Sequence, residues 1–214
     1  MEILVIGSES NLKECKAKFG DAYNYHHFTN HPGVRAFLKP ESVVFDFEPN
    51  DVSIYNQKGP TVFLNSTSST LKKLTSEKSS QALLFGFCGI PSFLNREILE
   101  IAVLNNESGG SLENICVKLN TKYKIVEDRT GMITPRIICM IINEAYFAIE
   151  ENVASRVDID LAMKLGTNYP FGPFEWCDKI GIKNVYELLN AVYNDTKDER
   201  YKICGLLKKE ALNT

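Results

Sequence analysis

Residues 153–181 read VASRVDIDLAMKLGTNYPFGPFEWCDKIG, and this stretch predicts helices joined by a tight turn. Ser155 followed by Asp158 is a variant of the capping box, so we expect a helix to begin directly after Ser155. Residues 168–173 combine asparagine, proline and glycine, which favour a turn. Further helical patterns follow the turn. This part of the chain is therefore predicted to be helical.

The helical pattern begins upstream of this stretch, at Pro135. Proline is tolerated in the first turn of a helix, where the missing amide would lack a partner anyway. The residues from there to about Glu151 predict one long helix. Its apolar residues surround the helix nearly completely, so we expect it to be central and buried.

The first half of the chain alternates short apolar runs with turn-rich stretches and helical patterns. Continuous apolar runs of this length suit strands that are covered on both faces. Alternation of such strands with helices favours a parallel sheet in an α/β layer. The predicted strands are 2–7, 42–47, 60–64, 81–85, 98–104 and 123–126, and the predicted helices are 8–19, 69–76 and 111–120. The change in pattern predicts an α/β domain over residues 1–127 and an all-α domain over residues 128–214.

Composition narrows the classes of partner and compartment. A formal net charge of -3 gives no electrostatic reason to expect nucleic acid or an anionic membrane as a partner. The first residues lack a basic region and a long apolar stretch, so no signal peptide is expected, and no apolar run suits a membrane span. The six cysteines have no CxxC spacing. We expect a reduced, cytoplasmic protein.

Several of these segments resemble the C-terminal domain of the 3-hydroxyacyl-CoA dehydrogenase family. The segments are 126–133 with Arg136, 142–145, and the stretch 153–181 quoted above. The resemblance implies a reduced Rossmann-like sheet followed by a helical domain like the C-terminal domain of 6-phosphogluconate dehydrogenase. In this family the helical domain forms the subunit interface and one wall of the acyl-CoA cleft. The resemblance thus implies acyl-CoA as a ligand and a homodimer.

The resemblance also assigns candidate catalytic positions. The run NSTSS at residues 65–69 matches the S-N-T-S-S run of the family and places Ser68 on its functional serine. Pro135 stands where the family has a functional asparagine. A third position, the catalytic histidine, is occupied by Cys88 in the run GFCGIP. Glu100, twelve residues after Cys88, fits the glutamate that orients the histidine.

The exchange of histidine for Cys88 changes the chemistry that this position could perform. Oxidation of a 3-hydroxyacyl thioester needs a base for the hydroxyl proton, and histidine suits this task because its pKa is near neutral. A cysteine has an unperturbed pKa of about 8.5, and a nearby carboxylate such as Glu100 would raise it further. Cys88 could instead act as a covalent nucleophile, but a small buried core residue is the preferred interpretation.

The family binds NAD at a glycine-rich turn, and Gly7 is the one candidate cofactor-binding residue here. The turn reads GSESNL, so only the first glycine of the G-x-G-x-x-G fingerprint is present. Glu9 would place a carboxylate beside the diphosphate, where like charges repel. The next candidate strand ends at Phe28 without an acid at its tip. The resemblance implies NAD, whereas these residues predict that a complete NAD site is absent.

Other chemistry-bearing residues have structural interpretations beside functional ones. His26, His27 and His31 could form a metal site, but Pro32 argues against the helix that such spacing would need, so we prefer a solvated loop and expect no metal. Ser68 could cap the helix that follows it. Asp158 and Asp160 could serve as caps or as dipole partners at a helix start.

Three hypotheses about function follow. The leading one is a catalytically impaired 3-hydroxyacyl-CoA dehydrogenase relative in fatty-acid metabolism that binds acyl-CoA or dimerises, either with itself or with an active homologue. The second is an active NAD-dependent oxidoreductase with an atypical cofactor site. The third is a structural oligomerisation protein.

Overall fold

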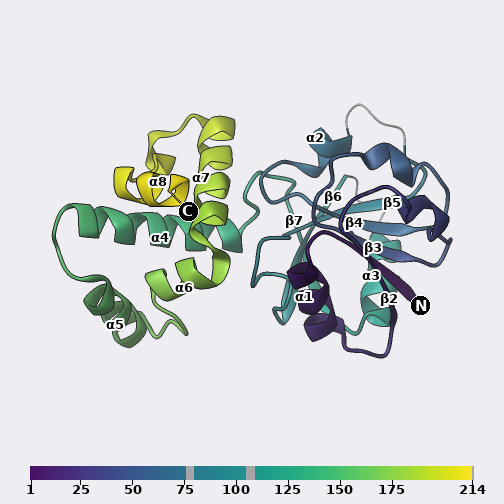
Figure 1. Cartoon of the computed structure of the whole chain (residues 1–214), viewed down its shortest axis with the longest axis horizontal. Helices are drawn as coiled ribbons and strands as arrows, with labels where there is room; N and C mark the ends of the chain where they lie inside the picture. The colour runs from purple at the N-terminus through teal and green to yellow at the C-terminus, as the bar shows by residue number, and fades with distance from the viewer. Residues whose placement is uncertain (76–79, 105–108, 214) are drawn as a thin grey trace. The chain divides into compact units, whose positions relative to one another are not determined.

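The computed structural model describes residues 1–75, 80–104 and 109–213 (Figure 1). The chain divides into two compact units, Met1–Met132 (unit 1) and Ile133–Thr214 (unit 2). The sequence predicted this division after residue 127. Within the described residues, all seven strands lie in unit 1, and unit 2 is helical.

Unit 1 is built on a seven-stranded sheet with the order β2-β1-β3-β4-β5-β6-β7. The first five strands in sequence are parallel, β6 is antiparallel to β5, and β7 is parallel to β6. The strands are β1 (Glu2–Ile6), β2 (Asn24–Phe28), β3 (Val43–Asp46), β4 (Thr61–Asn65), β5 (Leu83–Phe87), β6 (Ile98–Val103) and β7 (Lys122–Val126). The sheet confirms the predicted α/β class.

The sheet is mostly parallel, as predicted, and the exception is the antiparallel pairing of β6 with β5. Residues 88–97, which connect β5 to β6, contain no helix. Parallel neighbours need a crossover of a dozen or more residues, whereas antiparallel neighbours can be joined by a short connection. The sequence pattern predicted both strands but carried no signal for their relative direction.

The sheet is covered on both faces by elements of unit 1. Figure 1 shows α2 on one side of the sheet and α1 and α3 on the other. α1 (Glu9–Phe19) and α3 (Gly109–Lys118) pack on the face that carries Phe45, Phe63 and Phe85. The opposite face packs against α2 (Leu71–Thr75) and the 3-10 helices η1 (Val34–Ala36) and η2 (Val52–Tyr55). The helix predicted over residues 69–76 is α2, and Ser76 lies outside the described residues.

The strand order shows how this Rossmann-like sheet is reduced. A classical sheet has the order 3-2-1-4-5-6, in which a third strand pairs outside the second. Here the chain passes from β2 to β3 through η1 alone, and β2 is the edge strand. The order reverses between β1 and β3, so the carboxyl ends of these two strands form the switch point where such folds bind ligands.

Unit 2 is a helical assembly arranged around α4. This helix contacts α5, α6, α7 and α8, as expected for a central helix, although Ile137 on it is 54% exposed. The elements are α4 (Thr134–Glu150), α5 (Arg156–Thr167), α6 (Pro173–Ile180), α7 (Ile182–Thr196), η4 (Glu199–Tyr201) and α8 (Gly205–Leu212). Pro135 lies in the first turn of α4, which confirms the predicted helix start.

The caps of α5 and α6 explain much of the stretch 153–181. The hydroxyl of Ser155 accepts a hydrogen bond from the Asp158 amide at 3.2 Å, so the predicted cap is confirmed. Asp160 acts on a different helix from the one expected. Its carboxylate accepts from the amides of Phe174 at 2.8 Å and Glu175 at 3.2 Å, at the start of α6. A Cβ on Gly172 would lie 2.3 Å from this carboxylate, so residue 172 must be glycine.

All six cysteines are buried free thiols. In the part of the chain that the structure describes, no helix has both the length and the apolar character needed to cross a bilayer.

We predict that Asp160→Asn destabilises the chain by about 1–2 kcal/mol, because an amide keeps one acceptor oxygen and turns its NH2 group toward the second backbone donor. The exposed Asp178 of α6 provides the matched control, and Asp178→Asn should change stability by less than about 0.5 kcal/mol. Urea unfolding followed by helical circular dichroism measures both variants. Equal stabilities of the two variants would contradict the assigned cap.

Candidate functional site

The turn after β1 is the place where a Rossmann-like sheet would hold a diphosphate. Gly7 directly follows β1 and has a φ of 146°. A Cβ at this position would lie 2.6 Å from Oδ1 of Asn11 and 3.0 Å from Cβ of Phe47. Phe47 follows β3 and is 6% exposed. The side chains of Asn11 and Phe47 therefore lie against Gly7, near the switch point between β1 and β3.

The hydrogen-bonding groups of this turn bind one another. Oδ1 of Asn11 accepts from the Ser8 amide at 2.8 Å and from the Ser8 hydroxyl at 2.8 Å. The Asn11 amide in turn donates to the Ser8 hydroxyl at 3.3 Å. Anion sites at helix starts depend on backbone amides that point at the ligand, and the amides of Ser8 and Asn11 are already engaged.

The charges around the turn also disfavour a dinucleotide. Glu9 lies in the first turn of α1, where a bound diphosphate would need positive potential. Its carboxylate lies 3.5 Å from Nδ1 of His27, and Nε2 of His27 lies 2.9 Å from the carbonyl oxygen of Gly7. The tip of β2 thus carries a histidine that binds the turn, where NAD-binding sheets carry an acid for the ribose. The residues present do not fit the diphosphate and ribose of NAD.

One side chain, Asn65, joins the carboxyl ends of three neighbouring strands. Its Nδ2 donates to the carbonyl oxygen of Phe47 after β3 at 3.1 Å. Its Oδ1 accepts from the Gly89 amide after β5 at 3.0 Å and from the Thr67 hydroxyl at 2.6 Å. The Gly89 amide also donates to Oγ1 of Thr67 at 3.1 Å. The loops after β3, β4 and β5 are therefore fastened together by one network.

Gly89 is the residue that lets these loops approach so closely. A Cβ at this position would lie 2.6 Å from Cγ of Asn65. Asn65 and Gly89 were not among the candidate site residues predicted from the sequence. An asparagine followed by serine and threonine after an apolar run was the available signal, because such side chains bind nearby backbone groups at turns.

Cys88 is held beside this network and is 6% exposed. Burial raises the pKa of its thiol to about 12, against the weaker opposite effect of hydrogen bonding to Thr67 and Ile90. The charge of Glu100 raises this pKa as well. The antiparallel register, which pairs Phe87 with Ile101, places Glu100 next along from Cys88. The structure thus brings together two of the residues selected from the sequence.

Ser68 follows Thr67 and is exposed. It does not cap α2, contrary to one interpretation of the sequence. The Lys73 amide of that helix donates to the Thr70 hydroxyl at 3.1 Å, and the Leu71 amide donates to the carboxylate of Asp128. Pro135, the fourth position selected by resemblance, is buried in α4 of unit 2. The catalytic roles of these positions stay predictions.

The histidine cluster is dispersed, and its preferred interpretation as a solvated loop was wrong. His26 and His27 are successive residues of β2, so they face opposite sides of the sheet. His31 lies in the following connection, where its Nε2 is 2.9 Å from the buried carboxylate of Asp46. Tyr55 donates to the same carboxylate oxygen at 2.8 Å. Across residues 1–75, 80–104 and 109–213, no group of three potential metal ligands occurs.

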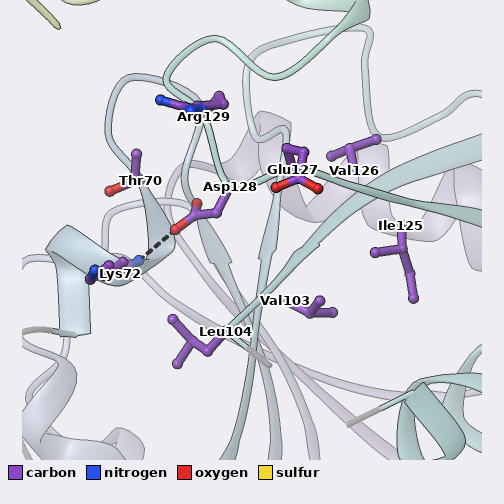
Figure 2. A pocket seen from close by; sticks show the side chains of 9 residues that line it. All are labelled: Thr70, Lys72, Val103, Leu104, Ile125, Val126, Glu127, Asp128 and Arg129. Carbon is purple, nitrogen blue, oxygen red and sulfur yellow. Dashed lines mark hydrogen bonds between the residues drawn. The ribbon is translucent and has the colours of Figure 1, made fainter. Parts of the chain in front are cut away.

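Unit 1 also contains a hollow of about 750 Å³ away from Cys88 (Figure 2). It is lined by the ends of β6 and β7, by the start of α2 and by the segment after β7. Thr70, Lys72, Val103, Leu104, Ile125, Val126, Glu127, Asp128 and Arg129 form its walls. None of the residues selected from the sequence as catalytic or cofactor-binding lines it.

Part of this chain matches a known protein family in sequence. Residues 131–213 match the model of the 3-hydroxyacyl-CoA dehydrogenase C-terminal domain. The 3-hydroxyadipyl-CoA dehydrogenase of Escherichia coli (strain K12) is 44% identical over 87 residues, which are 41% of this chain and 18% of that protein. The 3-hydroxybutyryl-CoA dehydrogenase of Clostridioides difficile is 28% identical over 156 residues, which are 71% of this chain and 56% of that protein. The chain thus spans between 18% and 56% of the length of these relatives.

Solved structures show the same likeness. The (S)-3-hydroxybutyryl-CoA dehydrogenase from Ralstonia eutropha matches with a TM-score of 0.73 over 99% of this chain and 93% of that chain, at 17% identity, which shows a common fold. The 3-hydroxybutyryl-CoA dehydrogenase from Escherichia coli K12 matches with a TM-score of 0.59 at 30% identity, over 71% of this chain and 31% of that chain.

We predict that His31 stabilises the fold in a pH-dependent way. Its hydrogen bond to Asp46 raises the pKa of His31 above the ordinary 6.5. A raised pKa in the folded state means that the contribution is complete below the unfolded pKa and is lost as the pH rises through the folded pKa. His31→Gln should therefore lower the free energy of unfolding more at about pH 5 than at about pH 9.

Urea titrations at both pH values test this dependence, and the same substitution in an Asp46→Asn background is the control. In that background the difference between the two pH values should vanish, because the carboxylate partner is gone. A loss of stability on His31→Gln that is independent of pH would refute the assigned ion pair.

Proposed function

Since the chain belongs to the 3-hydroxyacyl-CoA dehydrogenase family through its C-terminal helical unit, we propose that it is a catalytically impaired member that binds a CoA thioester. The closed carboxyl edge of the sheet carries this proposal. Asn11 and Phe47 lie against Gly7, and Asn65 ties the neighbouring loops together. A diphosphate seated against Gly7 would have to displace the side chains of Asn11 and Phe47.

The thiol at Cys88 supports the same proposal. A general base acts best when its pKa lies near the working pH. With a pKa raised to about 12 by burial, the Cys88 thiol holds its proton at neutral pH and cannot accept one from a substrate hydroxyl. Glu100, which would orient a histidine, here raises that pKa further. Both the cofactor-binding turn at Gly7 and the residue at the position of the catalytic base, Cys88, thus differ from what the reaction needs.

The exposed surface of α5 supports assembly with a second copy. None of the residues of α5 is buried. Val157, Leu161 and Leu165 are 75%, 50% and 78% exposed and recur every fourth residue, which places them on one helix face. Exposed apolar stripes of this kind are typical of protein interfaces. A homodimer through unit 2 is therefore part of the proposal, and the same surface also favours the third hypothesis, a structural oligomerisation protein.

The proposal predicts binding without turnover. Acetoacetyl-CoA should bind in isothermal titration, and NADH oxidation in its presence should stay at background for the unmodified chain. Cys88→His should remain near background too, because it restores the imidazole but leaves the turn at Gly7 unchanged. The absorbance of NADH follows turnover. The measured rate is compared with the rates of ordinary enzymes, which are on the order of 1–10³ s⁻¹.

Each outcome selects one function. Turnover by the unmodified chain at ordinary rates would establish the active oxidoreductase, and turnover by Cys88→His alone would contradict the closed cofactor site. Failure of acetoacetyl-CoA to bind would leave the structural protein as the function.

The proposal also predicts that Leu161→Glu converts a dimer into a monomer, because a carboxylate in the centre of an apolar contact would be buried without a partner. Light scattering after size exclusion should give twice 24.1 kDa for the unmodified chain and 24.1 kDa for this variant. The control is Leu212→Glu, the same change at a 64% exposed leucine of α8, which should stay dimeric. A monomeric unmodified chain, or a dimeric Leu161→Glu variant, would argue against the interface.

A further inference from the structure

The loop that carries Ser68 spans residues 67–72 and joins β4 to α2; we call it the Ser68 loop. At its first residue the Thr67 side chain belongs to the Asn65 network. At its last two residues, Leu71 and Lys72, the chain enters α2. Ser68 itself is exposed between these two ends. How the ends are fixed therefore decides where Ser68 points.

Asp128 fixes the second end of the Ser68 loop. Its Oδ1 accepts from the Leu71 amide at 2.6 Å and its Oδ2 from the Lys72 amide at 2.8 Å. Figure 2 shows the Asp128 side chain pointing toward the start of α2, with the bond to Lys72 drawn. A carboxylate is suited to this task, because it accepts two charge-assisted hydrogen bonds at once. Residues far apart in the sequence are thereby joined through one side chain.

Gly131 fixes the first end. Its amide donates to the carbonyl oxygen of Thr67 at 2.7 Å. Gly131 has a φ of 84° and Met132 a φ of 49°, so the chain adopts the left-handed conformation twice in succession here. Between the two contacts Thr130 is buried. Residues 128–131 thus hold the Ser68 loop at both ends, and unit 2 begins directly after Met132.

The hollow of Figure 2 lies between these two segments. Thr70 and Lys72 line it from the Ser68 loop, and Asp128 and Arg129 line it from the opposite segment. A molecule that lies against the Ser68 loop on this side would contact both segments at once.

We propose that residues 128–131 act as a clamp on the Ser68 loop, with Asp128 as the positioning residue, and that they couple a thioester at this loop to the segment leading into unit 2. This inference rests on the proposed function, which supplies the thioester. Coupling is reciprocal: if the clamp positions the loop for the ligand, the ligand must also stabilise the clamp. Loss of this ligand-induced ordering when Asp128 is replaced distinguishes this role from a merely structural one.

The experiment combines calorimetry with hydrogen exchange on the full chain. Asp128→Ala, and the milder Asp128→Asn if the first variant folds poorly, should weaken acetoacetyl-CoA binding by about fivefold or more. In the unmodified chain acetoacetyl-CoA should slow amide exchange over residues 128–132. In Asp128→Ala this protection should be lost, and exchange over residues 67–72 should rise without ligand. Asp21→Asn, the same loss of charge at an exposed residue, should leave all three readouts unchanged.

The outcomes separate this inference from the proposed function. No binding of acetoacetyl-CoA to the unmodified chain overturns the proposed function and the coupling together. Binding that is equally tight in Asp128→Ala, or ligand protection of residues 128–132 that survives this substitution, overturns the coupling alone.

Discussion

The carboxyl edge of the sheet depends on Asn65. Three loops begin there, and this one amide side chain binds a group of each: it donates to the carbonyl oxygen of Phe47, and it accepts from the Gly89 amide and the Thr67 hydroxyl. An amide whose donor and acceptor are both satisfied rigidifies its surroundings, whereas an unsatisfied buried one is costly. Hydrogen bonds through Asn65 thus join the strand ends at the edge where parallel α/β sheets usually bind a ligand.

The contacts around Gly7 and the buried Cys88 both support the proposed loss of dehydrogenase activity. A reaction that removes hydride and proton together needs a seat for the acceptor and a base of suitable pKa. In this chain Asn11 and Phe47 lie against Gly7, and burial raises the pKa of the Cys88 thiol to about 12. The loop around Ser68 is exposed, and both of its ends are anchored by hydrogen bonds. In unit 2, α5 has an exposed apolar face.

Local signals in the sequence sufficed for elements whose structure is decided locally. The cap at Ser155, the proline in the first turn of α4 and the strand pattern of β1 all depend on neighbours a few residues away. The direction of β6 depends on the path of the loop before it, and the pattern of apolar residues is the same for either direction. Contacts between distant residues left no local signal: Asp160 with the start of α6, His31 with Asp46, and Asp128 with the start of α2. For Cys88 both the substitution and the burial were predicted from the sequence, and the structure confirms the burial.

We propose that the turn at Gly7 does not admit a dinucleotide. Amide NMR of the isotope-labelled chain during addition of NADH tests it at the atoms concerned, the backbone amides of Gly7, Ser8 and Asn11. We expect these resonances to stay in place up to millimolar NADH. Saturable shifts of the same three amides at micromolar NADH would show that the turn opens for the diphosphate and would contradict the account.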